Sequence, residues 1–135
     1  MQIKPSTPLI FVAEDDLSIL ELVITRLTQA GYRTRYAVNG LEAWQGIRES
    51  EPDGVLLDIN MGGMDGLAVL SAIRSHPPTR KTPVLMMTAR GGPEDVGEAI
   101  RLGAQDYLAK PFDVRILVQR VARLVGRRAV AGAPG

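Results

Sequence analysis

The stretch LIFVAEDDLSILELVITRLTQAG, residues 9–31, contains the first strand-like and the first helix-like segment of the chain. The first five of these residues are a continuous apolar run, and its short length and the acidic stop at Glu14 favour a buried strand. From Leu17 onward, apolar residues recur at spacings of three and four, which is typical of an amphipathic helix, and Gly31 supplies its stop. The segment therefore predicts a strand, an acidic turn and a helix.

The same alternation recurs along the rest of the chain. Further strands are predicted at residues 33–38, 55–57, 84–87 and 107–109, and further helices open near residues 39, 67, 93 and 113, the last ending at about Arg127. Because a helix occupies every return from one strand to the next, the strands must pair in parallel through right-handed crossovers. The pattern predicts an α/β fold: a doubly wound parallel sheet of five strands with five helices.

Composition excludes several classes of chemistry. The 135 residues fit one domain, and the absence of Cys excludes disulfide frameworks, thiolate metal sites and cysteine nucleophiles. His76 is the one histidine, so Ser–His and multi-His sites are excluded as well. A net charge of +1 gives no global field toward nucleic acid or anionic membranes, and we expect no direct nucleic-acid binding. No apolar run approaches a membrane span or a signal peptide, so we expect a soluble protein of a reducing cytoplasm.

Polar residues follow the predicted strands where each strand ends. They are Glu14, Asp15 and Asp16 after the first strand, Asp58 after the third, Thr88 after the fourth and Lys110 after the fifth. In doubly wound sheets ligands bind beyond the carboxyl ends of the strands. Clustered carboxylates repel one another unless a hard cation such as Mg²⁺ joins them, and Lys and Thr suit phosphoryl oxygens. The set predicts a site in which carboxylates bind a metal and a phosphoryl group. Taken alone, Asp15 or Asp16 could instead be a helix N-cap.

Four motifs carry these residues: VAEDD at 12–16, DINMGGMDG at 58–66, MTA at 87–89 and YLAKPF at 107–112. With them, the chain resembles the receiver domain of two-component response regulators over about residues 8–126. The resemblance implies a flavodoxin-like sheet in strand order 2-1-3-4-5. Residues 1–7 would then be an N-terminal extension, and residues 127–135 a flexible tail or the start of a linker.

The resemblance also implies a role for each site residue. Asp58 would accept a phosphoryl group from the phosphohistidine of a sensor kinase or phosphotransfer protein. The metal, Mg²⁺ or Mn²⁺ in its place, would be held by Glu14, Asp15, Asp58 and the Asn60 carbonyl. Thr88 and Lys110 would contact the phosphoryl oxygens, Lys110-Pro111 would be a cis peptide, and the Tyr107 rotamer would follow phosphorylation.

On this interpretation the chain is a signalling module and not an enzyme, apart from its own phosphorylation and autodephosphorylation. The face made by the fourth helix, fifth strand and fifth helix would control a downstream protein or a fused output domain. Asp106 and Arg120 suit a phosphorylation-dependent homodimer through that face.

One departure from the family pattern lies in the loop after Asp58. Gly62 stands where the family usually has proline, and Gly63 follows it, so the loop gains conformational freedom. Asn60 and Arg90 occupy positions that tune autodephosphorylation in this family.

Three other functions remain open at this point. An FMN carrier would share the topology, but three acidic residues after the first strand repel a phosphate without a metal. An aspartyl-phosphate phosphatase would need a second acid where Asn60 stands. A receiver-like domain that is never phosphorylated would not need the full set of site residues.

Overall fold

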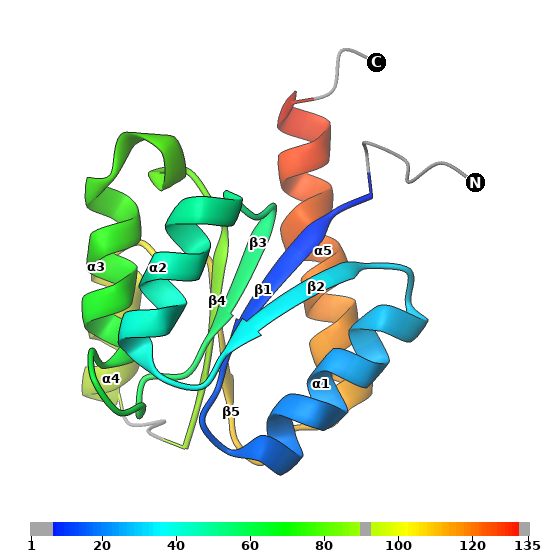
Figure 1. Cartoon of the computed structure of the whole chain (residues 1–135), viewed down its shortest axis with the longest axis horizontal. Helices are drawn as coiled ribbons and strands as arrows, with labels where there is room; N and C mark the ends of the chain where they lie inside the picture. Colours follow the sequence, from blue (N-terminus) through cyan, green and yellow to red (C-terminus); the bar gives the residue numbers. More distant parts are fainter. Residues whose placement is uncertain (1–6, 90–92, 133–135) are drawn as a thin grey trace.

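The computed structural model describes residues 7–89 and 93–132, and within them five parallel strands form one sheet in the order β2-β1-β3-β4-β5 (Figure 1). The strands are β1 (Leu9–Ala13), β2 (Arg33–Ala37), β3 (Gly54–Leu57), β4 (Val84–Thr88) and β5 (Asp106–Ala109). Strand order and pairing confirm the predicted flavodoxin-like topology. Its reversal point lies between β1 and β3, whose carboxyl ends carry Glu14 and Asp58.

Helices cover both faces of this sheet. They are α1 (Leu17–Gln29), α2 (Gly40–Ser50), α3 (Gly66–Ser75), α4 (Pro93–Arg101) and α5 (Val114–Gly132), with a 3-10 turn η1 (Pro77–Thr79) after α3. Figure 1 shows α2 and α3 on one side of the sheet and α1 and α5 on the other. Among the residues described, no helix combines the length and the apolar character that a bilayer span requires.

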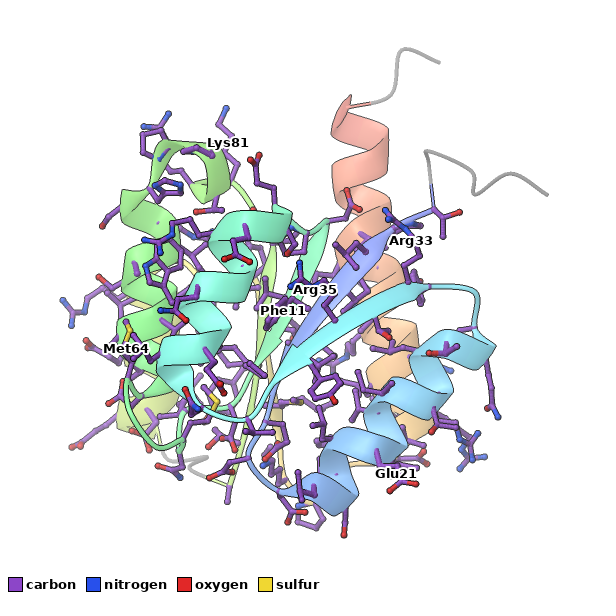
Figure 2. All side chains as sticks on the ribbon, in the orientation of Figure 1. Phe11, Glu21, Arg33, Arg35, Met64 and Lys81 are labelled. Carbon is purple, nitrogen blue, oxygen red and sulfur yellow. The ribbon has the colours of Figure 1, made fainter. Side chains whose placement is uncertain are left out.

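Alternate residues of β1 supply the two halves of the core. Phe11 and Ala13 pack with residues of α2 and α3, on the face where Figure 2 labels Phe11. Ile10 and Val12 pack with residues of α1 and α5. Both faces of the central strands are therefore buried, which explains why their sequences are continuous apolar runs and not alternating ones.

The structure differs from the sequence prediction at two places. Helix α5 continues to Gly132 instead of ending near Arg127, so the described part of the expected flexible tail is helical. Ala129 and Ala131 favour this, since alanine has the highest helix propensity. Leu17 belongs to the predicted apolar stripe of α1 but is 67% exposed, because it opens the helix at the edge of the sheet. Arg90 and the glycines before α4 lie outside the described residues.

Candidate functional site

Asp58 directly follows β3 and is almost completely buried, with 3% of its surface exposed. Its backbone N–H donates to the Ala13 carbonyl at 3.0 Å, which continues the pairing of β3 with β1 by one residue. Its Oδ1 accepts a hydrogen bond from the Asn60 backbone N–H at 3.1 Å, and its Oδ2 accepts one from Lys110 Nζ at 2.9 Å. Both carboxylate oxygens are thus held by positive or partly positive groups.

Lys110 reaches this site from the end of β5. Its backbone N–H donates to the Thr88 carbonyl at 2.9 Å, and the Lys110-Pro111 peptide is cis, as expected. Its ammonium contacts two carboxylates, Asp58 Oδ2 at 2.9 Å and Glu14 Oε1 at 2.6 Å. Burial by itself would lower the pKa of Lys110, but the neighbouring carboxylates of Glu14 and Asp58 outweigh burial and raise it. The ammonium therefore stays charged and joins two strand ends.

Glu14 is the most deeply buried acid of the site, with no exposed surface. Its Oε2 accepts the Asp16 backbone N–H at 3.0 Å. Burial raises the pKa of Glu14 to about 7 against the opposing effects of Lys110 and the Asp16 N–H, and the negative charge of Asp58 adds to the rise. Glu14 therefore changes its charge near neutral pH.

Asp15 and Asp16 take different positions although they are neighbours. Asp16 is the N-cap of α1, since its Oδ1 accepts the backbone N–H groups of Ser18 at 3.0 Å and Ile19 at 3.2 Å. Asp15 is exposed, and one oxygen each of Asp15, Glu14 and Asp58 lie within 4.8 Å of one another. The structure thus answers the question left open by the sequence: Asp16 caps the helix and Asp15 faces the acidic cluster.

The three acids fit a hard divalent cation. They offer carboxylate oxygens, which Mg²⁺ and Mn²⁺ prefer, from two strand ends. Glu14 Oε1 is also fully buried, and no described donor meets it at hydrogen-bonding angles, its contact with Lys110 being an ion pair. A cation beside Asp15 would neutralise charges that otherwise repel.

The remaining predicted site residues surround this cluster. Thr88 ends β4 and is fully buried, and Asn60 is exposed in the loop after β3. Tyr107 is half-buried in β5 and packs against the core cluster on the α2 and α3 side. It is therefore turned inward in this structure.

Sequence reasoning missed two interactions. It assigned Lys110 to phosphoryl oxygens and not to the buried Glu14, and no local sequence signal points to that pair. It also reserved Asp106 and Arg120 for a contact between molecules. In this structure Arg120 Nη1 donates to Asp106 Oδ1 at 2.9 Å within one molecule.

The strand order agrees with a comparison to known proteins. A sequence profile of the response regulator receiver domain matches residues 10–122. The chain belongs to this family. It is a receiver domain of two-component signalling, and not a conventional enzyme.

Three relatives illustrate the likeness of this receiver domain. It is 37% identical to the transcriptional regulatory protein PrrA of Mycobacterium leprae over 91% of this chain and 52% of PrrA. The receiver domain of the Francisella response regulator 1452 is 32% identical with a TM-score of 0.85, covering 90% of this chain and 99% of that one. The receiver domain of the sensor histidine kinase PA1611 from Pseudomonas aeruginosa PAO1 is 26% identical with a TM-score of 0.82. The match covers 90% of this chain and 99% of the PA1611 chain.

The PA1611 structure has a magnesium ion coordinated in its active-site cleft. The chain spans about half the length of PrrA. Family membership removes the FMN carrier from the alternatives.

Proposed function

We propose that this receiver domain accepts a phosphoryl group on Asp58. The observation that carries the proposal is the Lys110 ammonium, which joins Asp58 and Glu14 at the carboxyl ends of two neighbouring strands. A buried lysine that pairs two carboxylates places positive charge where transferred phosphoryl oxygens would arrive.

A divalent cation, Mg²⁺ with Mn²⁺ as a substitute, would be held by Glu14, Asp15, Asp58 and the Asn60 backbone carbonyl. When bound, it would neutralise charge on the phosphoryl oxygens. The acidic cluster supports this part of the proposal, and so does the magnesium site of the related PA1611 receiver.

The donor would be the phosphohistidine of a sensor kinase or phosphotransfer protein. A carboxylate oxygen of Asp58 forms a bond to phosphorus while the phosphorus–nitrogen bond of the donor breaks. The departing imidazole nitrogen keeps the bonding electron pair and is protonated by the solvent. Asp58 attacks as the carboxylate, and its Oδ2 lies 2.9 Å from the Lys110 ammonium.

The transfer changes the charge that Lys110 meets. An acyl phosphate carries about −2 charge on strong acceptor oxygens, so Lys110 and Thr88 would turn toward it. Tyr107 would change its rotamer with this movement. The face formed by α4, β5 and α5 would then control a downstream protein or an attached output domain, in the cytoplasm.

A phosphorylation-dependent homodimer through this face has an added requirement. Asp106 and Arg120 already pair within one molecule, so an exchange across two molecules would replace this bond and not add a new one. The gain in dimer stability from these two residues is therefore small.

Incubation with Mg²⁺ and acetyl phosphate, followed by intact-mass measurement, tests the proposal. We expect one phosphoryl adduct in the wild type and none in Asp58→Ala. Asp65→Asn is the matched control, because Asp65 is an exposed acid of the same loop that caps α3, and asparagine also caps. Absence of an adduct in folded wild type at any Mg²⁺ concentration, or an adduct that persists in Asp58→Ala, would overturn the proposal.

A further inference from the structure

The loop that joins β3 to α3 carries Asn60 and is closed at its base by Gly66. The Gly66 backbone N–H donates to the Ile59 carbonyl at 2.8 Å. A Cβ atom at Gly66 would lie 2.1 Å from the Asp58 carbonyl oxygen, far inside any real contact distance. The base of the loop therefore folds back onto the backbone of the residue that we propose as phosphoacceptor.

The tip of the same loop lies against the first turn of α2. Gly40, the first residue of α2, donates its backbone N–H to the Gly62 carbonyl at 2.9 Å. A Cβ atom at Gly40 would lie 1.7 Å from the Met64 carbonyl oxygen. Figure 2 labels Met64 at this place, beside the start of α2. Only a residue without a side chain allows this approach of two backbones.

The loop needs such an external contact because its own sequence is permissive. Gly62 has open space around it, and Gly63 has a φ of +77°, which other residues adopt rarely. Two consecutive glycines leave many conformations available to an isolated loop. One hydrogen bond and one close backbone contact to α2 restrict them.

The end of α2 that makes this contact is itself well fixed. Asn39 Oδ1 accepts the Glu42 backbone N–H at 2.8 Å, and Asn39 Nδ2 donates to Glu42 Oε2 at 2.7 Å. These two bonds cap the helix. The Gly40 N–H has no partner within the cap, and it donates to the Gly62 carbonyl of the loop instead. The first turn of α2 is thus a rigid support for the loop.

We infer that Gly40 is a positioning residue for phosphorylation: through the first turn of α2 it holds the β3–α3 loop so that the Asn60 backbone stays against Asp58. This inference rests on the proposed function of Asp58. The link is short, because Asn60 stands two residues before Gly62 and its N–H donates to Asp58 Oδ1 at 3.1 Å. Displacement of the loop tip would move both the donor to Asp58 and the carbonyl proposed as a metal ligand.

Gly40→Ala tests the inference with two measurements. Hydrogen exchange of the Asn60 amide, followed by NMR without metal, should become about tenfold faster, the factor that corresponds to the net free energy of one hydrogen bond. The rate of phosphorylation by acetyl phosphate with Mg²⁺ should fall about tenfold for the same reason. Exchange of the Asp58 amide, which donates to Ala13 in the sheet, should stay at the wild-type value. A general loss of stability would instead make hydrogen exchange faster at both amides.

Gly126→Ala is the matched control, because Gly126 also lies in a helix and a Cβ atom there meets nothing within 4 Å. It should change neither measurement. If Gly40→Ala does not fold, the same two measurements are made on Gly63→Ala. This substitution strains the backbone of the loop tip without a steric clash, because the atom nearest to the added Cβ would be 3.5 Å away.

Unchanged Asn60 exchange in the folded variant would overturn the inference, whether or not Asp58 is phosphorylated. Faster exchange with an unchanged phosphorylation rate would overturn the positioning role. Failure of the wild type to be phosphorylated would count against both the proposed function and this role, and the exchange measurement would still show whether α2 holds the loop.

Discussion

Lys110 Nζ lies 2.6 Å from Oε1 of Glu14, and both side chains are largely removed from solvent: the lysine is 14% exposed and the glutamate 0%. This pair joins the end of β5 to the end of β1 across the sheet order. Both residues belong to the proposed site. The charge state of the site is therefore coupled to the packing of the fold through a buried ion pair.

Replacement of Lys110 by alanine should separate metal binding from the switch. The three acids that would hold Mg²⁺ remain, so we expect the ion still to bind. The ammonium that would turn from Glu14 to the phosphoryl group is gone, so Tyr107 should keep its environment after phosphorylation. NMR signals of the Tyr107 ring report this, with the exposed Lys81→Ala as control. A Tyr107 response of wild-type size in phosphorylated Lys110→Ala would contradict the switch mechanism.

Glu14 should make both stability and metal affinity depend on pH. Its pKa is 4.5 as a free group and about 7 in the fold, mainly through burial. The folded state therefore holds more protons than the unfolded state between these values. Proton binding to Glu14 therefore stabilises the folded state. Without metal, this stabilisation is fully present below pH 4.5 and is lost as the pH rises to about 7. Urea unfolding at several pH values measures it.

The affinity for Mg²⁺ should change in the opposite direction. Since a protonated Glu14 is a poor ligand, affinity should rise by up to about tenfold per pH unit toward pH 7 and then level off. Calorimetric Mg²⁺ titrations at several pH values would show this. Glu14→Gln removes the titrating group, so an equally steep pH dependence in that variant would assign the effect to another residue.

Asp15 and Asp16 should give opposite results on alanine substitution. Asp16→Ala removes the N-cap of α1 and should lower the free energy of unfolding by about 1 kcal/mol, with Mg²⁺ affinity unchanged. Asp15→Ala removes an exposed oxygen of the acidic cluster and should weaken Mg²⁺ binding with little change in stability. Denaturant curves and metal titrations on both variants compare them. If Asp16→Ala weakened metal binding as strongly as Asp15→Ala, the division of roles would be wrong.

Arg74 should be a major contributor to stability far from the acidic site. Its guanidinium donates to the Gly103 and Thr82 carbonyls at 2.7 Å each and to Gln105 Oε1 at 2.9 Å. Arg74→Met keeps the apolar stem but leaves the two carbonyls without this donor, while Gln105 Oε1 still accepts the Val84 backbone N–H. We expect a loss of about 3 kcal/mol in the free energy of unfolding.

Arg101→Ala provides the comparison for Arg74, because Arg101 pairs with Glu98 on the surface of α4. Its unfolding midpoint should match the wild type, since surface ion pairs contribute little. Equal midpoints for Arg74→Met and Arg101→Ala would show that the Arg74 hydrogen bonds contribute no more than a surface contact.

The order of helices and strands was available from sequence because its signals are local. Short apolar runs such as residues 9–13 and helical stripes such as that of α1 need only neighbouring residues to be recognised. The topological rules for parallel sheets then bring Glu14, Asp58 and Lys110 to one edge without any side-chain detail. The lengths of single helices were less predictable: α5 continues through Gly126, although a glycine was the predicted stop of the first helix.

The amino-acid sequence by itself thus determined the fold, the family and the set of residues at the strand ends. Tertiary structure decided how these residues divide their roles: which of Asp15 and Asp16 caps α1, that Glu14 is fully buried beside Lys110, and that Gly40 supports the loop after Asp58. The physical reason is that capping, burial and pKa depend on atoms brought together from distant parts of the chain. A local pattern of apolar and polar residues specifies which elements form, but not the distances between the side chains that meet at their ends.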